Sequence, residues 1–278
     1  MSVVSVSHIA KRFGKVRAVD DVSFSVEGGE IFGMLGPNGA GKTTSIRIML
    51  DIFKPDRGRV EIFGGPMTEE KKERIGYMPE ERGLYQDAPL ERVLRYLAAL
   101  KGLRGAEASR RLKDYMERFD LYAYRRKKVK ELSKGMQQKA QIIATIAHHP
   151  DLLIVDEPFS GLDPVNTQMV KDLLDELRRG GTAIIMSTHM MHQAEALCDR
   201  ILLIDHGKVM LYGTLEDIRR PYMGNTLLVR TPVELPALPG VSATRMKNGT
   251  WRLTLEGGAT PQSVLESLVA ERIPVEHF

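Results

Sequence analysis

Residues 36–43 read Gly36-Pro37-Asn38-Gly39-Ala40-Gly41-Lys42-Thr43. They match the pattern G-x-x-x-x-G-K-[ST] at every specified position. An apolar run, residues 31–35, precedes this loop, and the pattern of residues 42–52 predicts a helix after it. Glycines let the backbone N–H groups of such a loop turn inward around phosphate, and the positive end of the helix dipole adds to the attraction. The loop therefore predicts a phosphate-binding site between a strand and a helix.

A second motif lies at the end of a later apolar run. Residues 152–155 are continuously apolar and of strand length, which is typical of a strand covered on both faces in a parallel sheet. Asp156 and Glu157 follow directly, at the strand end where open α/β sheets bind their ligands. Lys42 is expected to reach the β- and γ-phosphates of a nucleotide, and the Thr43 hydroxyl to ligate Mg²⁺.

The two carboxylates have different expected roles. Asp156 suits Mg²⁺, directly or through water, whereas Glu157 suits positioning or deprotonating an attacking water. Taken alone, the pair could be no more than the polar end of a strand. The loop at residues 36–43 makes a nucleotide site the favoured interpretation.

Residues 132–138 narrow the class of protein. They read Leu132-Ser133-Lys134-Gly135-Met136-Gln137-Gln138 and resemble the LSGGQ signature of ATP-binding-cassette (ABC) proteins. The other motifs come in the order typical of that family. Phe13 resembles its adenine-stacking aromatic residue, residues 160–163 its D-loop and His189 its switch histidine. The resemblance covers roughly residues 3–215.

The resemblance implies an ATP hydrolase in which two copies pair head to tail around two ATP molecules. It implies that ATP binds Phe13, Gly36, Pro37, Asn38, Gly39, Ala40, Gly41, Lys42, Thr43 and Thr44. It implies that ATP held by a second copy is contacted by Ser133, Lys134, Gly135, Met136 and Asp163. It assigns catalysis to Lys42, Glu157 and His189. The expected Mg²⁺ ligands are Thr43, Asp156 and Glu80.

Two departures from the family pattern affect these expectations. Lys134 stands where glycine is usual and Met136 where glutamine is usual, although Ser133 and Gly135 are kept. Glu80 stands where the family has a glutamine that senses Mg²⁺ and links to the transporter. A carboxylate there could ligate Mg²⁺ with more charge, or repel phosphate, or be solvated on a loop that swings outward.

The alternation of strands and helices predicts an α/β fold. We expect a phosphate-loop NTPase cassette over residues 1–220, with a β-rich N-terminal subdomain and a helical insert at about residues 86–148. Prolines and glycines cluster after residue 219, which predicts a boundary and a small α+β C-terminal domain, residues 221–278. That domain is expected to contain strands at 226–230, 241–247, 250–256 and 273–277, and a helix at 261–270.

Composition sets limits on the function. Cys198 is the only cysteine of 278 residues, so an internal disulfide is excluded. The net charge of +4 does not by itself imply nucleic acid. The basic run at residues 125–130 could contact an acidic partner, a phosphate or a membrane surface, or could be a solvated loop. No apolar run approaches the roughly 20 residues of a membrane span, and residues 1–10 lack a signal-peptide pattern.

We therefore expect a soluble subunit that powers a separate polytopic membrane permease. It would be cytoplasmic and peripheral at the inner face of the membrane. Residues 79–85 and the C-terminal domain resemble cassettes of bacterial export-type systems, and that domain could add dimer contacts, regulate, or merely extend the packing. The alternative is an ABC ATPase acting on ribosomes or nucleic acid, which only the basic run favours. A nucleotide-binding regulator without hydrolysis is disfavoured by Lys42, Asp156, Glu157 and His189.

Overall fold

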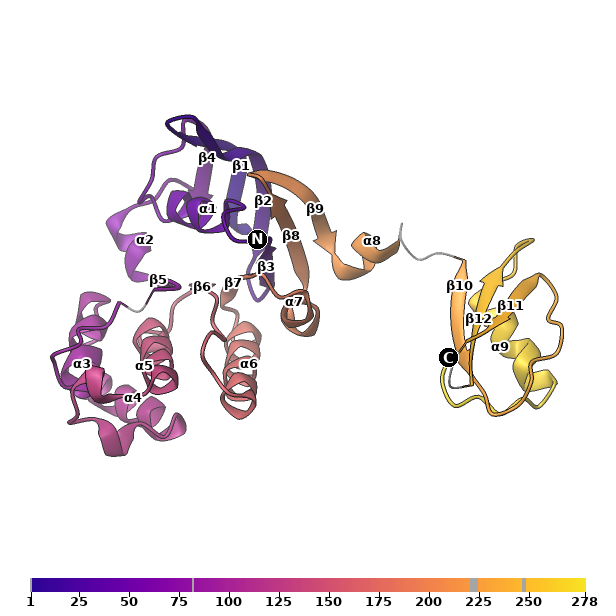
Figure 1. The fold of residues 1–278 in the computed structure, drawn as a ribbon. Coiled ribbons are helices and arrows are strands. Elements are labelled where there is room, and N and C mark those ends of the chain that lie inside the picture. Colours follow the sequence, from indigo (N-terminus) through magenta and orange to yellow (C-terminus); the bar gives the residue numbers. More distant parts are fainter. Residues whose placement is uncertain (1, 82, 221–224, 247–248) are drawn as a thin grey trace. The chain divides into compact units, whose positions relative to one another are not determined.

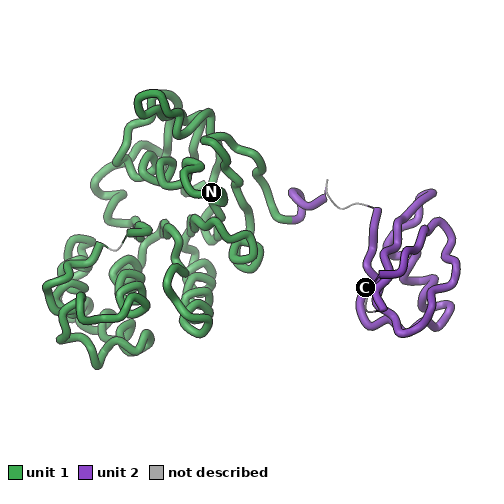
Figure 2. The backbone as a smooth tube through the Cα atoms, in the orientation of Figure 1, with its two compact units in different colours: residues 1–215 green, residues 216–278 purple. Residues whose placement is uncertain are grey.

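The chain divides into two compact units, residues 1–215 and 216–278 (Figure 2). The computed structural model describes residues 2–81, 83–220, 225–246 and 249–278. The sequence predicts a domain boundary after residue 220. The first residues of its C-terminal domain, 221–224, lie outside the described residues, as does Lys247 at the end of a predicted strand.

A six-stranded sheet in the order β5-β6-β7-β3-β8-β9 forms the centre of the first unit. The first five strands are parallel, and β9 pairs antiparallel with β8. Their bounds are β3 (Ile31–Leu35), β5 (Ile75–Met78), β6 (Leu152–Asp156), β7 (Ala183–Thr188), β8 (Arg200–Asp205) and β9 (Lys208–Thr214). Every residue of β3, β6 and β7 is buried, because both faces of these strands are covered. This confirms the prediction made from the apolar run at 152–155.

A second, antiparallel sheet packs on the first together with the helix α1 (Lys42–Met49). Its strands, in the order β2-β1-β4, are β1 (Ser2–Phe13), β2 (Val16–Glu27) and β4 (Arg57–Ile62). The two sheets share one apolar core, in which Phe24 stacks on Phe32 with ring centroids 5.2 Å apart. This is the β-rich N-terminal part that the sequence predicts.

Helices between β5 and β6 form the predicted helical insert (Figure 1). They are α3 (Leu90–Leu100), α4 (Gly105–Arg118), the 3-10 turns η1 (Tyr122–Tyr124) and η2 (Val129–Glu131), and α5 (Lys134–Ile146). Apolar residues at helical spacing, such as Leu90, Leu94 and Leu112, are buried between these helices. Lys101 Nζ donates to the carbonyls of Lys72 (2.7 Å) and Ile75 (2.9 Å), which ties the end of α3 to β5.

The remaining helices of the first 220 residues flank the central sheet or follow it. They are α2 (Glu69–Glu73), α6 (Pro164–Arg179), α7 (Met191–Leu197) and α8 (Leu215–Arg219). The short elements α2, α8 and β9 were not expected from the sequence. These elements are five to seven residues long, and so short a segment carries too little periodicity to distinguish it from a loop.

After α8, the described residues of the second unit form a three-stranded antiparallel sheet and a helix that packs on it. Its strands, in the order β10-β12-β11, are β10 (Thr226–Arg230), β12 (Thr250–Leu255) and β11 (Val241–Arg245), and the helix is α9 (Pro261–Ala270). Val264 and Leu268 of α9 pack with Val229 and Leu253 of the sheet.

The strand expected at residues 273–277 is wrong. Only His277 forms a bridge there, opposite Arg230. Pro274 lacks the N–H that a continued ladder needs, while Ile273 and Val275 pack against the apolar core of the unit. The alternation of the sequence is therefore satisfied by packing without a strand.

The imidazole of His148, which follows α5, provides a test of the packing of the helical insert in the first unit. Burial, together with the nearby Lys101 charge, lowers the pKa of His148 to about 4. The unfolded chain, with a histidine pKa of about 6.5, therefore binds more protons between these two pH values, and stability falls as the pH falls through that window.

We predict that His148→Leu removes this pH dependence. Between pH 7 and pH 4.5 the parent should lose on the order of 2 kcal/mol more of its free energy of unfolding than the variant. Denaturant titration at both pH values measures this difference. His206→Leu, at a side chain that is 94% exposed, is the control and should behave as the parent does. Equal losses in the parent and His148→Leu would contradict the assignment.

Candidate functional site

The loop between β3 and α1 requires glycine at two positions. Gly36 has φ 151° and Gly41 has φ 111°, a region that other residues rarely adopt. A Cβ at Gly36 would lie 2.1 Å from the Ile204 carbonyl oxygen, and one at Gly41 would lie 2.4 Å from the Ala18 oxygen. The loop is thus pressed between neighbouring backbone segments, and its shape depends on both glycines.

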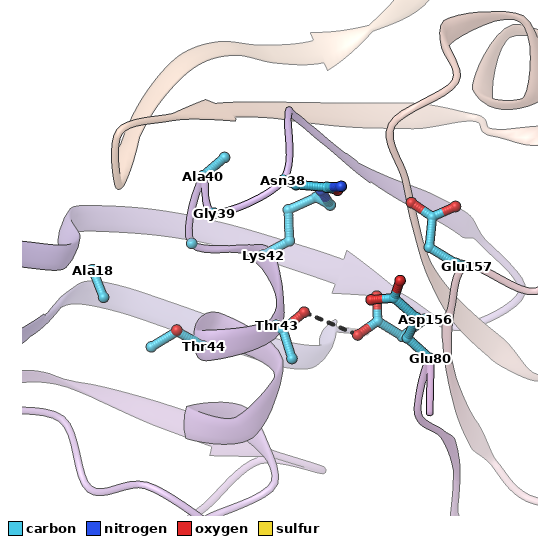
Figure 3. Close-up of a pocket in the computed structure, with 11 residues that line it drawn as sticks. Ala18, Asn38, Gly39, Ala40, Lys42, Thr43, Thr44, Glu80, Asp156 and Glu157 are labelled. Atoms are coloured by element: carbon cyan, nitrogen blue, oxygen red, sulfur yellow. Dashed lines mark hydrogen bonds between the residues drawn. The ribbon is translucent and has the colours of Figure 1, made fainter. Parts of the chain in front are cut away.

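Lys42 and Thr43, the first residues of α1, orient their side chains toward different parts of the site. The Lys42 side chain is buried, and its Nζ donates to the carbonyls of Gly36 (2.7 Å) and Pro37 (3.1 Å). Thr43 Oγ1 donates to Asp156 Oδ2 at 3.0 Å (Figure 3). The first turn of α1 therefore presents an ammonium group over the loop and joins the loop to the end of β6.

The Asp156 carboxylate is held from both sides. It is 2% exposed, and its Oδ1 accepts a hydrogen bond from the Ser187 hydroxyl. The parallel register of β6 and β7 pairs these two residues directly. Two hydroxyl donors and the nearby N-terminus of α1 together compensate for the burial of this charge.

Glu157 is fixed in an uncommon backbone conformation beside His189. Its φ is 50°, in the left-handed region, and its N–H donates to the Ser187 carbonyl at 3.1 Å. Its Oε1 accepts from the His189 N–H at 3.0 Å and lies 2.7 Å from His189 Nδ1. Left-handed residues other than glycine are strained and cluster at functional sites. In this conformation the carboxylate lies against the histidine.

The glycine loop, the start of α1 and the acidic pair surround a pocket of about 230 Å³ (Figure 3), which Ser187 and His189 do not line. It is lined by Ala18, Asn38, Gly39, Ala40, Gly41, Lys42, Thr43, Thr44, Glu80, Asp156 and Glu157. The loop after β5 thus brings Glu80 to the same pocket as the acidic pair. Across the described residues, no three His, Cys, Asp or Glu side chains group closely enough to hold a metal ion by themselves.

Other predicted site residues lie apart from this pocket. Phe13, at the end of β1, is 44% exposed and packs edge-on against Phe53 with ring centroids 5.4 Å apart. Ser133 is the N-cap of α5, where its Oγ accepts from the Met136 N–H at 3.2 Å. Asp163 caps α6 in the same way. Neither these residues nor Lys134 and Gly135 line the pocket.

Side chains of α5 connect this helix to the site. Gln138 Nε2 donates to the Pro158 carbonyl (3.1 Å), just after the acidic pair. Gln141 Nε2 donates to the Pro79 carbonyl (2.9 Å), next to Glu80. The contacts of Gln138, Gln141 and Ser187 were not expected from the sequence. Ser187 could have been found, because it ends an apolar strand and parallel strand ends share one sheet edge. The glutamines carry no such signal.

A strand, a glycine loop and a helix, with an acidic pair at the end of a neighbouring parallel strand, define a phosphate-loop NTPase. The family model described as ABC transporter matches residues 19–160. The chain belongs to the ABC transporter family as an ATP-binding, ATP-hydrolysing subunit. ATP-binding subunits of this family dimerise and work with a separate membrane permease.

Individual relatives agree with this membership. The chain is 42% identical over 235 residues to an uncharacterized ABC transporter ATP-binding protein of Methanocaldococcus jannaschii, covering 83% of this chain and 86% of that protein. It is 34% identical to the linearmycin resistance ATP-binding protein of Bacillus subtilis, covering 82% and 75%. A solved structure of the ATP binding subunit of an ABC transporter is 34% identical with a TM-score of 0.75, covering 79% and 93%.

The loop geometry predicts that two of its glycines differ in their tolerance of a methyl group. Gly41→Ala should lower the free energy of unfolding by more than about 2 kcal/mol, because its Cβ meets the Ala18 carbonyl. Gly39→Ala is the matched control. Its φ is also positive, at 79°, but its Cβ would have open space, so only backbone strain of about 1 kcal/mol is expected. Denaturant unfolding measures both, and equal effects would contradict the assigned clash.

Proposed function

We propose that the pocket at the end of β3 and β6 binds ATP and hydrolyses it to drive export through a separate permease. The observation that carries this proposal is the hydrogen-bonded connection from the loop to the acidic pair. Thr43 binds Asp156, and the adjacent Glu157 binds His189. In this proposal residues 1–220 form the ATPase domain and residues 221–278 a C-terminal extension.

ATP binding uses the loop and the start of α1. Backbone N–H groups of residues 36–44 surround the phosphates, and Lys42 Nζ neutralises the β- and γ-phosphates. Phe13 stacks on the adenine from the end of β1. Its exposed ring supports this role, because a stacking platform needs a free face.

Mg²⁺ fits the hydroxyl and carboxylate pair of Thr43 and Asp156. This ion is typically bound through one or two carboxylates together with substrate phosphates and waters. When bound, it neutralises charge on the β- and γ-phosphates. Glu80 lines the same pocket and offers a further carboxylate to the ion or to its waters.

Hydrolysis is assigned to Glu157 and His189. The Glu157 carboxylate accepts the proton of the attacking water, and its fixed backbone holds it at the pocket. His189 contacts both Glu157 and, in this proposal, the γ-phosphate. The 2.7 Å contact between Nδ1 and Oε1 keeps the base and the histidine in one arrangement.

A second copy completes the site. Ser133, Lys134, Gly135, Met136 and Asp163 contact ATP held by that copy. Two observations support this: these residues do not line the pocket of their own chain, and a Cβ on Gly135 would lie 3.4 Å from the Gly161 carbonyl. The signature and the D-loop are therefore adjacent and can meet the same nucleotide.

The permease is proposed to dock at a pocket of about 270 Å³ between the Glu80 loop and the helical insert. Apolar side chains, including Leu84, Leu97 and Leu100, line much of it. Gln141 lines it as well and bonds the Pro79 carbonyl, which links docking to the ATP site. The chain would thus lie at the inner face of the membrane. Co-purification with a polytopic membrane protein tests this assignment, and recovery with ribosomes instead would contradict it.

Export is supported by the relative named for linearmycin resistance, since resistance to a compound suits its removal. No helix in the part of the chain that the structure describes is long and apolar enough to span a membrane. In the proposal the permease selects the cargo.

We predict that Glu157→Gln traps an ATP-bound dimer with little turnover. The amide keeps the shape of the side chain but cannot accept the proton of water. Phosphate release should fall at least a hundredfold, while size-exclusion chromatography with ATP and Mg²⁺ shows a dimer. Glu70→Gln, on the exposed helix α2, is the control and should hydrolyse at the parental rate. Parental turnover by Glu157→Gln would remove Glu157 from the role of base.

The role of Glu80 has a separate test. Glu80→Gln should shift the Mg²⁺ concentration for half-maximal hydrolysis several-fold, because it removes a carboxylate from the pocket. Glu81→Gln makes the same change at the next residue, which does not line the pocket, and should leave that concentration unchanged. An unaltered Mg²⁺ dependence in Glu80→Gln would show that Glu80 acts neither on the ion nor on its waters.

A further inference from the structure

The helical insert carries a concentration of positive charge that ATP hydrolysis does not use. Residues 87–95 and 122–131 contain seven Lys or Arg and three Asp or Glu, an excess of four positive charges. The net charge of the whole chain is also +4, so the rest of the chain is balanced. We call this set the basic surface; it consists of Arg92, Arg95, Arg125, Arg126, Lys127, Lys128 and Lys130.

Hydrogen bonds hold the two segments together as one surface. Backbone N–H groups at the start of α3 donate to carbonyls of the segment 122–131. The Glu91 N–H donates to the Arg125 carbonyl and the Leu90 N–H to the Lys127 carbonyl, both at 2.9 Å. In return, the Val129 N–H donates to the Ala88 carbonyl at 3.1 Å. The charges therefore stand on a defined backbone. A groove of about 290 Å³ runs along the seam and is lined by Pro89, Glu91, Arg92, Arg95, Arg125 and Arg126.

The carboxylates in these segments are already engaged. Asp87 pairs with Lys130 at 2.6 Å and Glu91 with Arg95 at 3.0 Å. Glu131 accepts from the Lys128 backbone N–H at 2.7 Å. Other cations of the basic surface have no such partner in the part of the chain that the structure describes. Among those residues, no carboxylate oxygen lies within 4 Å of the side-chain nitrogens of Arg92, Arg126 or Lys128.

We propose that the basic surface binds the phosphate headgroups of an anionic phospholipid bilayer. Guanidinium groups match phosphate geometry, and each Lys or Arg near an anionic leaflet strengthens binding roughly fivefold. Two exposed tyrosines flank the first of these segments in sequence, Tyr85 just before it and Tyr96 directly after it. Tyr85 and Tyr96 pack edge-on at 5.6 Å and are 56% and 49% exposed, and such amphipathic rings suit a membrane interface.

The choice of a bilayer over a nucleic acid rests on the proposed function. The helix α3 lines the proposed permease pocket near its end, at Leu97 and Leu100, and lines the basic groove near its start, at Arg92 and Arg95. Its 11 residues span roughly 16 Å. A cassette docked on a membrane protein through one end of this helix thus carries the basic groove within that distance of the docking site.

Vesicle co-sedimentation of the purified full chain tests the proposal. Vesicles of phosphatidylglycerol and phosphatidylcholine should bind the chain, high salt should release it, and vesicles of phosphatidylcholine alone should not bind it. The variant Arg92→Gln/Arg126→Gln/Lys128→Gln should bind at least tenfold more weakly. The control Lys54→Gln/Arg57→Gln/Arg59→Gln loses the same charge from exposed positions on and next to the antiparallel sheet, and should bind as the parent does.

Three results would overturn the proposal. They are equal weakening in both triple variants, equal binding to both kinds of vesicle, and binding to a short RNA with none to the anionic vesicles. ATP hydrolysis by the same preparations separates this inference from the proposed function. If the parent hydrolyses ATP but does not bind vesicles, only the lipid proposal is rejected. If the parent does not hydrolyse ATP, the ATPase assignment is rejected.

Discussion

The hydrogen bond between the Thr43 hydroxyl and the Asp156 carboxylate joins the two halves of the candidate site. One partner begins the helix after the glycine loop, and the other ends a fully buried parallel strand. The bond is possible because β6 and β3 flank β7, so the carboxyl ends of all three strands meet at one sheet edge. The same sheet edge also positions Glu157, Ser187 and His189, because these residues lie at or just after the ends of β6 and β7.

The same geometry explains why one chain holds only part of the proposed machinery. The pocket is surrounded by residues of the loop, the acidic pair and the Glu80 loop. The signature residues instead cap and begin α5, with Ser133 as its N-cap. Buried glutamines connect this helix to the Glu80 loop and to the segment after Glu157. Gln141 also lines the proposed permease pocket, so α5 connects that pocket to both the nucleotide site and the signature.

The sequence predicts the central features of this fold because they depend on local chemistry. The loop at 36–43 and the acidic pair can be read from residue type and spacing, and so can the buried strands. The contact between Ser187 and Asp156 depends on strand register, and the Gln141 contact depends on how α5 packs. Neither of these two contacts produces a periodic pattern in the sequence. The expected strand at 273–277 failed for a similar reason, since its alternation reflects packing against the core, and Pro274 interrupts the ladder.

The central claim is that each ATP site combines the loop of one copy with the signature of another. Mixing two inactive variants tests it most directly. Lys42→Ala disables the loop, whereas Ser133→Asp keeps an oxygen to cap α5 but places a negative charge against the γ-phosphate. A mixed dimer then contains one intact composite site, so the account predicts that mixing restores ATP hydrolysis well above the sum of the two separate variants. A mixture no more active than that sum would contradict it.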